Sequence, residues 1–148
     1  MAASAKRIFW IVTIAAALIA SVSVGIRQNF GQFLPNITAD LGIGREAFAF
    51  AMALLNIVWG ITTPIVGALA DKFGSGRMIA LGGLSYIVGL FIMSSAESTT
   101  GLNISTGLFI GFGQAAAGFA VLLGAVARRV PASRRSVALG IATAGGSF

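Results

Sequence analysis

The chain has 148 residues, of which 57% are apolar and only 9% are charged, and its mean hydropathy is +0.94. Average soluble domains carry about 25% charged residues, so a water-soluble fold of this composition would lack the polar surface to cover its core. The net charge is +6, and the sequence contains neither cysteine nor histidine. These absences argue against disulfides, thiolate chemistry, a histidine-based triad and a zinc site. The composition therefore predicts an all-α integral membrane protein that is not an enzyme and needs no cofactor.

Long apolar runs, uncharged except for Arg27 late in the first, divide the chain into predicted membrane spans. A helix needs about 20 residues to cross a hydrocarbon core of about 30 Å. Four runs meet this length, at residues 8–34, 47–70, 78–96 and 102–127. A fifth run starts near residue 136 and is still apolar at residue 148, so we expect a truncated fifth helix and a chain that is a fragment of something longer. The first run is too long for a signal-peptide core and is interpreted as an uncleaved helix.

Prolines and polar residues mark the expected ends of these spans. Pro35 is expected to end the first helix, because proline disfavours helical geometry in the residue before it. Thr38 and Asp40 are then plausible cap or turn residues in an outer loop. Pro131 is expected to break any continuous helix between the fourth and fifth spans. The loops are short, so none of them is expected to hold a soluble domain.

Basic residues lie almost entirely on one side of the predicted membrane. When the sides are numbered alternately from the N-terminus, the first side carries eight Lys and Arg residues and the second carries only Arg45. The eight are Lys6, Arg7, Lys72, Arg77, Arg128, Arg129, Arg134 and Arg135. The positive-inside rule therefore predicts a multi-pass protein with a cytoplasmic N-terminus. Because these residues flank apolar runs and do not form a continuous patch, nucleic acid is not expected as a partner.

A short charged turn joins the second and third predicted spans and reads GALADKFGSGR from Gly67 to Arg77. Gly67 lies near the end of the second helix, where a glycine allows a neighbouring backbone to approach closely. Asp71 ends that span with a negative charge, and Gly74 and Gly76 permit the positive φ of a tight turn. The pattern by itself fits a plain helix hairpin. It also fits a latch, in which Asp71 and Arg77 form ion pairs or dipole contacts that hold one conformation of a moving bundle.

The pattern G-x-L-A-D-K-x-G-x-x-R at this place resembles the signature loop between helices two and three of the major facilitator superfamily. Gly67, Asp71, Gly74 and Arg77 match the family pattern, whereas the two residues before Arg77 stand where basic residues are common. The resemblance implies a gating loop that closes the cytoplasmic side by pairing with the second half of a transporter. It also implies that this chain is four and a half helices of a fold built from two six-helix halves.

Two further strings narrow the resemblance to one branch of that superfamily. Residues 31–42 (GQFLPNITADLG) and 134–141 (RRSVALGI) are similar to the first outer loop and the helix-five entry of bacterial monocarboxylate and oxalate/formate porters. The resemblance implies alternating access around a central site and a bacterial inner membrane. The missing partner would then be the C-terminal half of the transporter.

Arg27 is the candidate substrate-binding residue of most interest, because it lies well inside the first span. A charge at membrane depth costs about 2.5–3.5 kcal/mol on insertion scales and usually faces a cavity or a partner. Gln28 shares its polar helix face. The alternative is that Arg27 extends to the outer headgroups. No Asp or Glu lies inside the four spans, so an unpaired guanidinium there favours an anionic solute over a cationic one.

Two amides and one tyrosine are further polar residues of note inside the spans. Asn56 and Gln114 lie mid-span in the second and fourth runs and are candidate solute contacts or interhelical hydrogen bonds. Tyr86 is expected to pack, because the third helix of this fold is usually peripheral. By the family resemblance, Arg27, Gln28, Asn56 and Gln114 would line the first-half cavity. A stripe of small residues in the fourth run is expected to pack closely against other helices: Gly107, Gly111, Ala115 and Gly118.

The function that these observations favour is transmembrane transport of a small solute by alternating access, with a small organic anion such as a monocarboxylate as the expected substrate. Two alternatives stay open. One is a small four-helix protein that acts as an oligomeric exporter, although such exporters carry an acidic residue in the first helix and this chain has none there. The other is a non-transporting membrane subunit.

Overall fold

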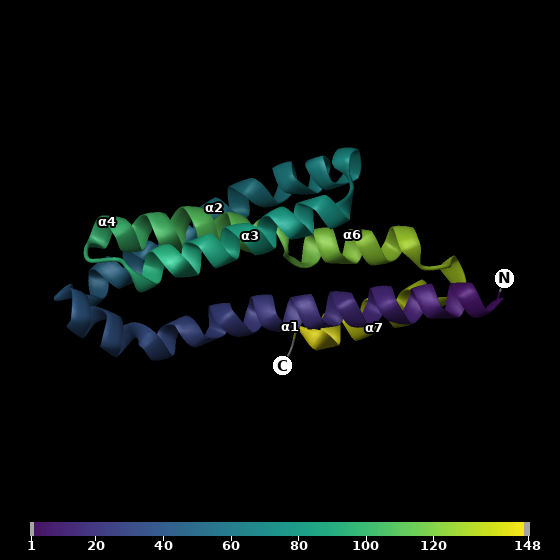
Figure 1. Cartoon of the computed structure of the whole chain (residues 1–148), viewed down its shortest axis with the longest axis horizontal. Helices are drawn as coiled ribbons and strands as arrows, with labels where there is room; N and C mark the ends of the chain where they lie inside the picture. The colour runs from purple at the N-terminus through teal and green to yellow at the C-terminus, as the bar shows by residue number, and fades with distance from the viewer. Residues whose placement is uncertain (1, 147–148) are drawn as a thin grey trace.

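The computed structural model describes residues 2–146, which contain helices and no strand. Figure 1 shows the helices lying along one long axis, with the N-terminus and the α6–α7 connection toward one end and the α1–α2 turn at the other. The elements in chain order are α1 (Ala2–Leu41), α2 (Arg45–Phe73), α3 (Ser75–Ser94), α4 (Thr99–Leu102), the π-helical η1 (Asn103–Ile110), α5 (Gly111–Ala116), α6 (Phe119–Arg129), the 3-10 turn η2 (Ala132–Arg134) and α7 (Arg135–Gly145).

Four helical stretches of the described chain are long and apolar enough to cross a membrane. They are Lys6–Leu41, Arg45–Phe73, Ser75–Ser94 and Thr99–Arg129, and the shorter α7 follows them. Their outward faces keep large apolar side chains exposed, including Leu18, Ile87 and Phe91 at 61%, 66% and 75%. Exposed apolar faces of this extent suit a lipid environment. The all-α membrane fold that the composition predicts is confirmed.

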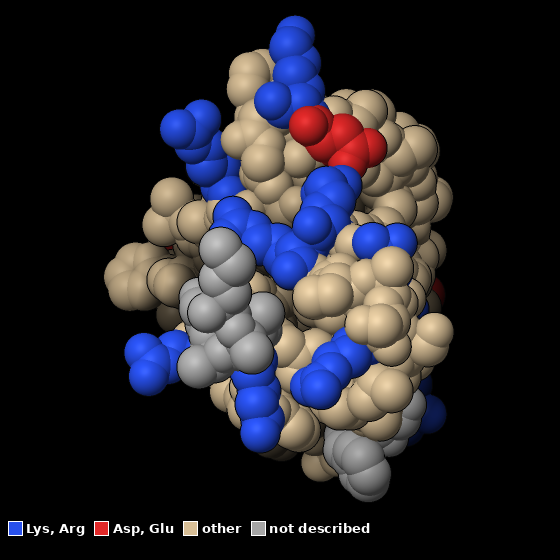
Figure 2. All heavy atoms as spheres, turned by 90° about the vertical axis from the view of Figure 1, so that its right-hand side faces the viewer, with Lys and Arg blue, Asp and Glu red and all other residues tan. Residues whose placement is uncertain are grey.

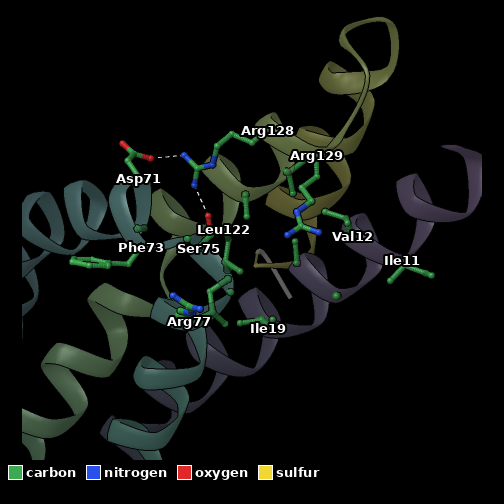
Figure 3. A pocket seen from close by; sticks show the side chains of 18 residues that line it. Ile11, Val12, Ile19, Asp71, Phe73, Ser75, Arg77, Leu122, Arg128 and Arg129 are labelled. Carbon is green, nitrogen blue, oxygen red and sulfur yellow. Dashed lines mark hydrogen bonds and ion pairs between the residues drawn. The ribbon is translucent and has the colours of Figure 1, made fainter.

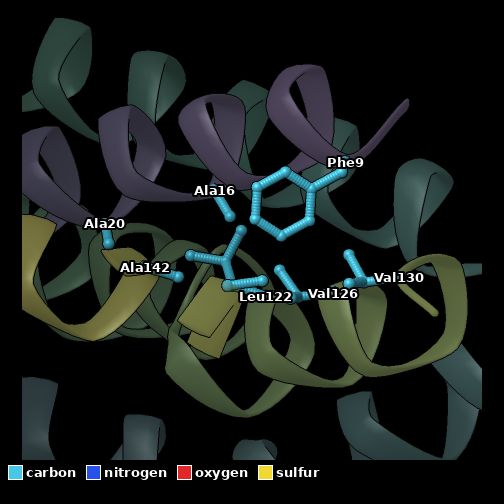
Figure 4. Close-up of a cluster of buried hydrophobic side chains, with 8 residues drawn as sticks. Phe9, Ala16, Ala20, Leu122, Val126, Val130 and Ala142 are labelled. Atoms are coloured by element: carbon cyan, nitrogen blue, oxygen red, sulfur yellow. The ribbon is translucent and has the colours of Figure 1, made fainter. Parts of the chain in front are cut away.

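Three clusters of buried apolar side chains hold the helices together. The first joins α1, α6 and α7 (Figure 4), and its members are Phe9, Ala16, Ala20, Leu122, Val126, Val130, Ala138 and Ala142. The second joins α1, α2, α3 and η1 around Phe30 and Leu55. The third joins α2, α3, α5 and α6 around Val66 and Val121. The small alanines of the first cluster allow α7 to pack directly along α1.

Glycines allow α3 and α5 to approach within backbone distance. A Cβ atom placed on Gly82 would lie 2.8 Å from both the Ala116 Cβ and the Ala117 nitrogen. A Cβ atom on Gly113 would lie 2.8 Å from Cδ2 of Tyr86. Real Cβ contacts of this length do not occur, so these positions accept only glycine without a shift of a helix.

The fourth spanning stretch, Thr99–Arg129, is called the fourth crossing. Its stripe of small residues packs as predicted at its first two positions. A Cβ on Gly107 would lie 2.5 Å from Cδ2 of Leu54, and one on Gly111 would lie 3.1 Å from the Leu55 carbonyl oxygen. Ala115 is buried in the third cluster. This crossing therefore packs against α2 through glycine on one side and against α3 through glycine on the other.

The fourth crossing is not the single regular helix expected over residues 102–127. It begins at Thr99, passes through the π-helical η1, and is interrupted after α5. The backbone turns away from helical geometry at Ala117 (ψ 10°) and at Gly118 (φ −81°, ψ 175°), which is the N-cap of α6. Gly118 is therefore a break between α5 and α6. The predicted packing stripe assumed one unbroken α-helix, so its spacing does not hold at Gly118.

Pro35 does not end the first helix, contrary to expectation, because α1 continues through it to Leu41. Thr38 and Asp40 accordingly lie inside α1 and not in a loop. The Thr38 hydroxyl donates to the Leu34 carbonyl oxygen at 2.7 Å and supports the turn that contains the proline. Leu41 packs against the second core cluster, so tertiary contacts outweigh the local proline preference. Pro131 does separate α6 from α7, as predicted.

Candidate functional site

A polar pair of side chains bridges α1 and α2 within the membrane-spanning region. Arg27 donates from Nη2 to Oδ1 of Asn56 at 2.8 Å, and its guanidinium carbon lies 4.8 Å from the centre of the Trp59 ring. Asn56 in turn donates to the Met52 carbonyl oxygen one turn earlier on α2. Arg27 is therefore held by an amide oxygen and by an aromatic face, with no carboxylate among its contacts in the described chain.

The extension of α1 places Arg27 deeper than a helix ending at residue 34 would. Fourteen residues separate Arg27 from Leu41, which corresponds to about 21 Å of helix. The guanidinium bends toward α2 instead of toward the helix end. This geometry favours the cavity interpretation of Arg27 over extension to the outer headgroups.

A second polar group lies one turn away, where α1, α3 and α5 meet. The Tyr86 hydroxyl donates to Oε1 of Gln114, and Ser23 Oγ lies 3.5 Å from the same oxygen. The Tyr86 hydroxyl oxygen also lies 3.3 Å from the Ser23 carbonyl oxygen. Gln114 is only 4% exposed and Tyr86 only 6%. Ser23 and Arg27 are four residues apart on α1, so the two groups share one helix face.

The structure brings three of the four predicted solute-contact residues to this region and leaves one outside it. Arg27, Asn56 and Gln114 take part in the contacts described above. Gln28 is exposed and forms no hydrogen bond with any described residue. Its place beside Arg27 in the sequence turns it about 100° around the helix, away from α2.

Sequence reasoning missed Ser23 and Trp59 and assigned Tyr86 to packing alone. Tyr86 does pack, since its ring lies under Gly113, but its hydroxyl also joins the polar group. A buried tyrosine hydroxyl normally requires a partner, but the sequence does not say which residue that partner is. Ser23 could have been found from its position four residues before Arg27.

The α2–α3 turn forms a charged contact with the fourth crossing. Arg128, at the end of α6, forms an ion pair with Asp71 and donates to the Ser75 hydroxyl (Figure 3). Gly74 adopts φ +95°, as the turn requires of a glycine, and its N–H donates to the Ala70 carbonyl oxygen at 3.0 Å. The side chains of Asp71 and Arg128 are 68% and 46% exposed, so the ion pair is solvent-screened.

Several expectations for this turn need correction. Gly76 lies inside α3 and has no positive φ. A Cβ atom on Gly67 would meet nothing within 4 Å in the described chain, so no neighbouring backbone approaches it there. Arg77 forms no ion pair with a described residue, and the partner of Asp71 is Arg128, which the motif does not contain. The pairing arises because α6 ends beside the turn.

Comparison with known proteins identifies the family. A family model described as Major Facilitator Superfamily matches residues 6–148. The chain belongs to the Major Facilitator Superfamily. Members of this superfamily are transporters and not enzymes, and the chain is accordingly a multi-pass membrane protein of a solute-transport family.

Curated relatives of this superfamily chain include two kinds of named transporter. Monocarboxylate transporter 11 of Mus musculus is 29% identical over 136 residues, which cover 92% of this chain and 30% of that protein. Monocarboxylate transporter 13 of Bos taurus is 29% identical over 136 residues, covering 92% of this chain and 32% of that protein. Riboflavin transporter RibZ of Clostridioides difficile (strain 630) is 32% identical over 107 residues, covering 72% of this chain and 23% of that protein.

The chain thus spans at most about a third of the length of these relatives. No solved structure matches it significantly.

Proposed function

We propose that this chain forms part of the solute path of a transporter that moves a small organic anion, such as a monocarboxylate, by alternating access. The N-terminus is proposed to lie in the cytoplasm and the protein in a bacterial inner membrane. The rest of the path is proposed to come from a second half that packs against this one. The observation that carries the proposal is the setting of Arg27 against Asn56 and Trp59.

The charge balance around Arg27 supports an anionic solute. Arg27 is the only charged residue between Arg7 and Asp40 on α1, and all four acidic residues of the chain lie at or near helix ends. A guanidinium has five N–H donors, and Asn56 accepts from one of its nitrogens, so donors remain for a carboxylate. Charge-assisted and bidentate pairing would favour that ligand over a neutral one.

The relatives support transport of a small solute, and most of those compared support a monocarboxylate. Two of them are named for monocarboxylates, whereas one is named for riboflavin, a larger solute. Uptake of a monocarboxylate and uptake of riboflavin are therefore both to be measured.

The end of the bundle that holds the α2–α3 turn and the end of α6 carries Arg77, Arg128 and Arg129 and is called the basic end. The contacts of the α2–α3 turn support a gating role for this end. The Asp71–Arg128 ion pair is exposed, so breaking it costs little free energy. A contact of this kind suits a surface that must open and close during each cycle. Gly67, Gly74 and Arg77 are proposed to act with Asp71 in that loop.

The test is uptake into proteoliposomes by the longest natural reading frame that contains this sequence. Reading the gene past the codon for Phe148 comes first, so that the assayed protein is the natural one. Labelled lactate or pyruvate is compared with labelled riboflavin. Unmodified protein is expected to take up the monocarboxylate, and Arg27→Ala is expected to abolish that uptake while membrane insertion is unchanged.

Two matched variants separate the anion role from a structural one. Arg27→Lys keeps the charge but loses the forked geometry, so uptake is expected to fall with a raised KM. Gln28→Ala, next to Arg27 but exposed, is expected to leave uptake unchanged. Undiminished uptake by Arg27→Ala would exclude Arg27 from the solute path, and uptake of riboflavin alone would exclude the proposed solute class.

A further inference from the structure

A cavity of about 710 Å³ lies at the basic end of the bundle, far along α1 from Arg27. Its walls come from residues 11–19 of α1, the α2–α3 turn, the start of α3 and residues 122–129 of α6. Figure 3 shows the side chains that line it. The cavity lies apart from Arg27, Asn56 and Gln114, but it shares Asp71, Gly74 and Arg77 with the proposed gating loop.

The rim of this cavity carries an excess of positive charge. Arg77, Arg128 and Arg129 line it together with one carboxylate, Asp71. Three positive charges and one negative charge leave a net charge of +2. Arg128 is committed to Asp71 and Ser75. Arg77 and Arg129 form no hydrogen bond or ion pair with any described residue, so both guanidinium groups are available to an anion.

The inner wall of the same cavity is apolar. Ile11, Val12 and Ile19 of α1 and Leu122 of α6 line it (Figure 3). The Ile11 side chain is 60% exposed, so the apolar wall continues onto the outer surface of α1 that would face lipid. A ligand that fills both parts must have an anionic head and an apolar tail.

The position of the cavity decides which ligand of that kind is available. Figure 2 shows Lys and Arg side chains gathered on this end of the bundle, where a membrane surface would lie. Basic pockets between membrane helices at a headgroup level bind anionic lipid headgroups, because the leaflet supplies the phosphate and the acyl chains together.

We propose that this cavity is a binding site for an anionic phospholipid of the adjacent leaflet. Arg77 and Arg129 bind the headgroup phosphate, and the acyl chains lie along the apolar wall and the outer face of α1. Because Arg128 and Ser75 lie on the same rim, the bound lipid is adjacent to the Asp71 ion pair. This site is independent of the proposed transported solute.

The experiment is a native mass spectrometry titration of the purified chain in neutral detergent. Phosphatidylglycerol is compared with phosphatidylcholine of the same acyl chains. Each arginine near an anionic lipid surface contributes about a fivefold factor, so Arg77→Gln/Arg129→Gln is expected to bind phosphatidylglycerol about 30-fold more weakly. Binding of phosphatidylcholine is expected to be weak in both proteins.

The matched control removes two positive charges from the same end without touching the cavity. Arg7 and Arg135 are exposed and do not line it, so Arg7→Gln/Arg135→Gln is expected to keep the phosphatidylglycerol affinity within about twofold. Glycerol 3-phosphate, which has the headgroup phosphate but no acyl chains, is expected not to displace the lipid at equal concentration.

Three outcomes would overturn the proposal. Equal binding of the two lipids by the unmodified chain does so even if the variants fail to fold. Equal losses in the cavity and control variants would show a general charge effect. Displacement by glycerol 3-phosphate would show that a free phosphate is sufficient and that the apolar wall has no part in binding.

Discussion

The polar groups inside the bundle and the charged turn at its end are built in opposite ways. Tyr86 and Gln114 are nearly fully buried and are joined by a neutral hydrogen bond, whereas Asp71 and Arg128 form an exposed ion pair. A buried polar atom that loses its partner carries the full desolvation cost, whereas exposed ions are resolvated by water. The difference indicates a rigid interior and a basic end that can rearrange at little cost.

The strongest test of the rigid interior is the α3–α5 contact on which the polar groups depend. Gly82→Val is expected to destabilise the chain by about 1–3 kcal/mol, because the new side chain overlaps the Ala116–Ala117 backbone. The measurement is the midpoint of thermal unfolding in detergent, followed by tryptophan fluorescence.

The adjacent glycine supplies the control for this substitution. A Cβ atom on Gly83 would meet no atom of residues 2–146 within 4 Å, so Gly83→Val is expected to leave the midpoint nearly unchanged. Equal falls in both variants would contradict the close approach of α3 and α5.

An intermediate effect is expected when one hydrogen bond is removed from the interior. Tyr86→Phe keeps the ring under Gly113 but leaves the Gln114 carbonyl with only the long Ser23 contact. The expected loss is about 0.5–1.5 kcal/mol, read from the same thermal unfolding. Ser94→Ala removes an exposed hydroxyl bonded to its own helix and should have almost no effect. If the two variants behave alike, the Tyr86 hydroxyl does not stabilise the interior.

The smallest effect is expected at the charged turn. Asp71→Asn should lower stability by less than about 1 kcal/mol, because both partners of the ion pair are exposed. The loss should vanish in about 1 M salt, where the Debye length is near 3 Å. The exchanged pair Asp71→Arg/Arg128→Asp is expected to recover the low-salt stability. A loss larger than that of Tyr86→Phe would reverse the comparison between the two regions.

The Pro35 result shows the limit of local rules in this chain. Proline removes one helical donor and disfavours helix before it, so a helix end was the reasonable expectation. In the structure, Thr38 donates to the Leu34 carbonyl oxygen within α1, and Leu41 packs against the second cluster. The Leu41 contact depends on where α2 returns along α1, which the residues around Pro35 do not encode.

The features of the candidate site also separate into those that local sequence predicts and those that depend on helix packing. The presence of Arg27 inside an apolar run, the amides at positions 56 and 114, and the charge of the turn could be read from the sequence, because charge and polarity inside an apolar run are visible without a fold. The depth of Arg27 could not, because it depends on the continuation of α1 to Leu41. The contact of Arg27 with Trp59 and the pairing of Asp71 with Arg128 could not, since each joins two helices through their relative rotation and offset.

By itself the sequence determined that this chain is a helical membrane protein of the Major Facilitator Superfamily whose Lys and Arg residues mostly flank alternate ends of its apolar runs. Those properties follow from hydrophobic run length, a local turn motif and the distribution of charge, all of which are linear in the chain. Only the tertiary structure decided that Tyr86 is a polar partner, that the fourth crossing breaks at Gly118, and that Arg77 and Arg129 line one cavity. These features depend on how helices far apart in the sequence pack against one another, which no single segment specifies.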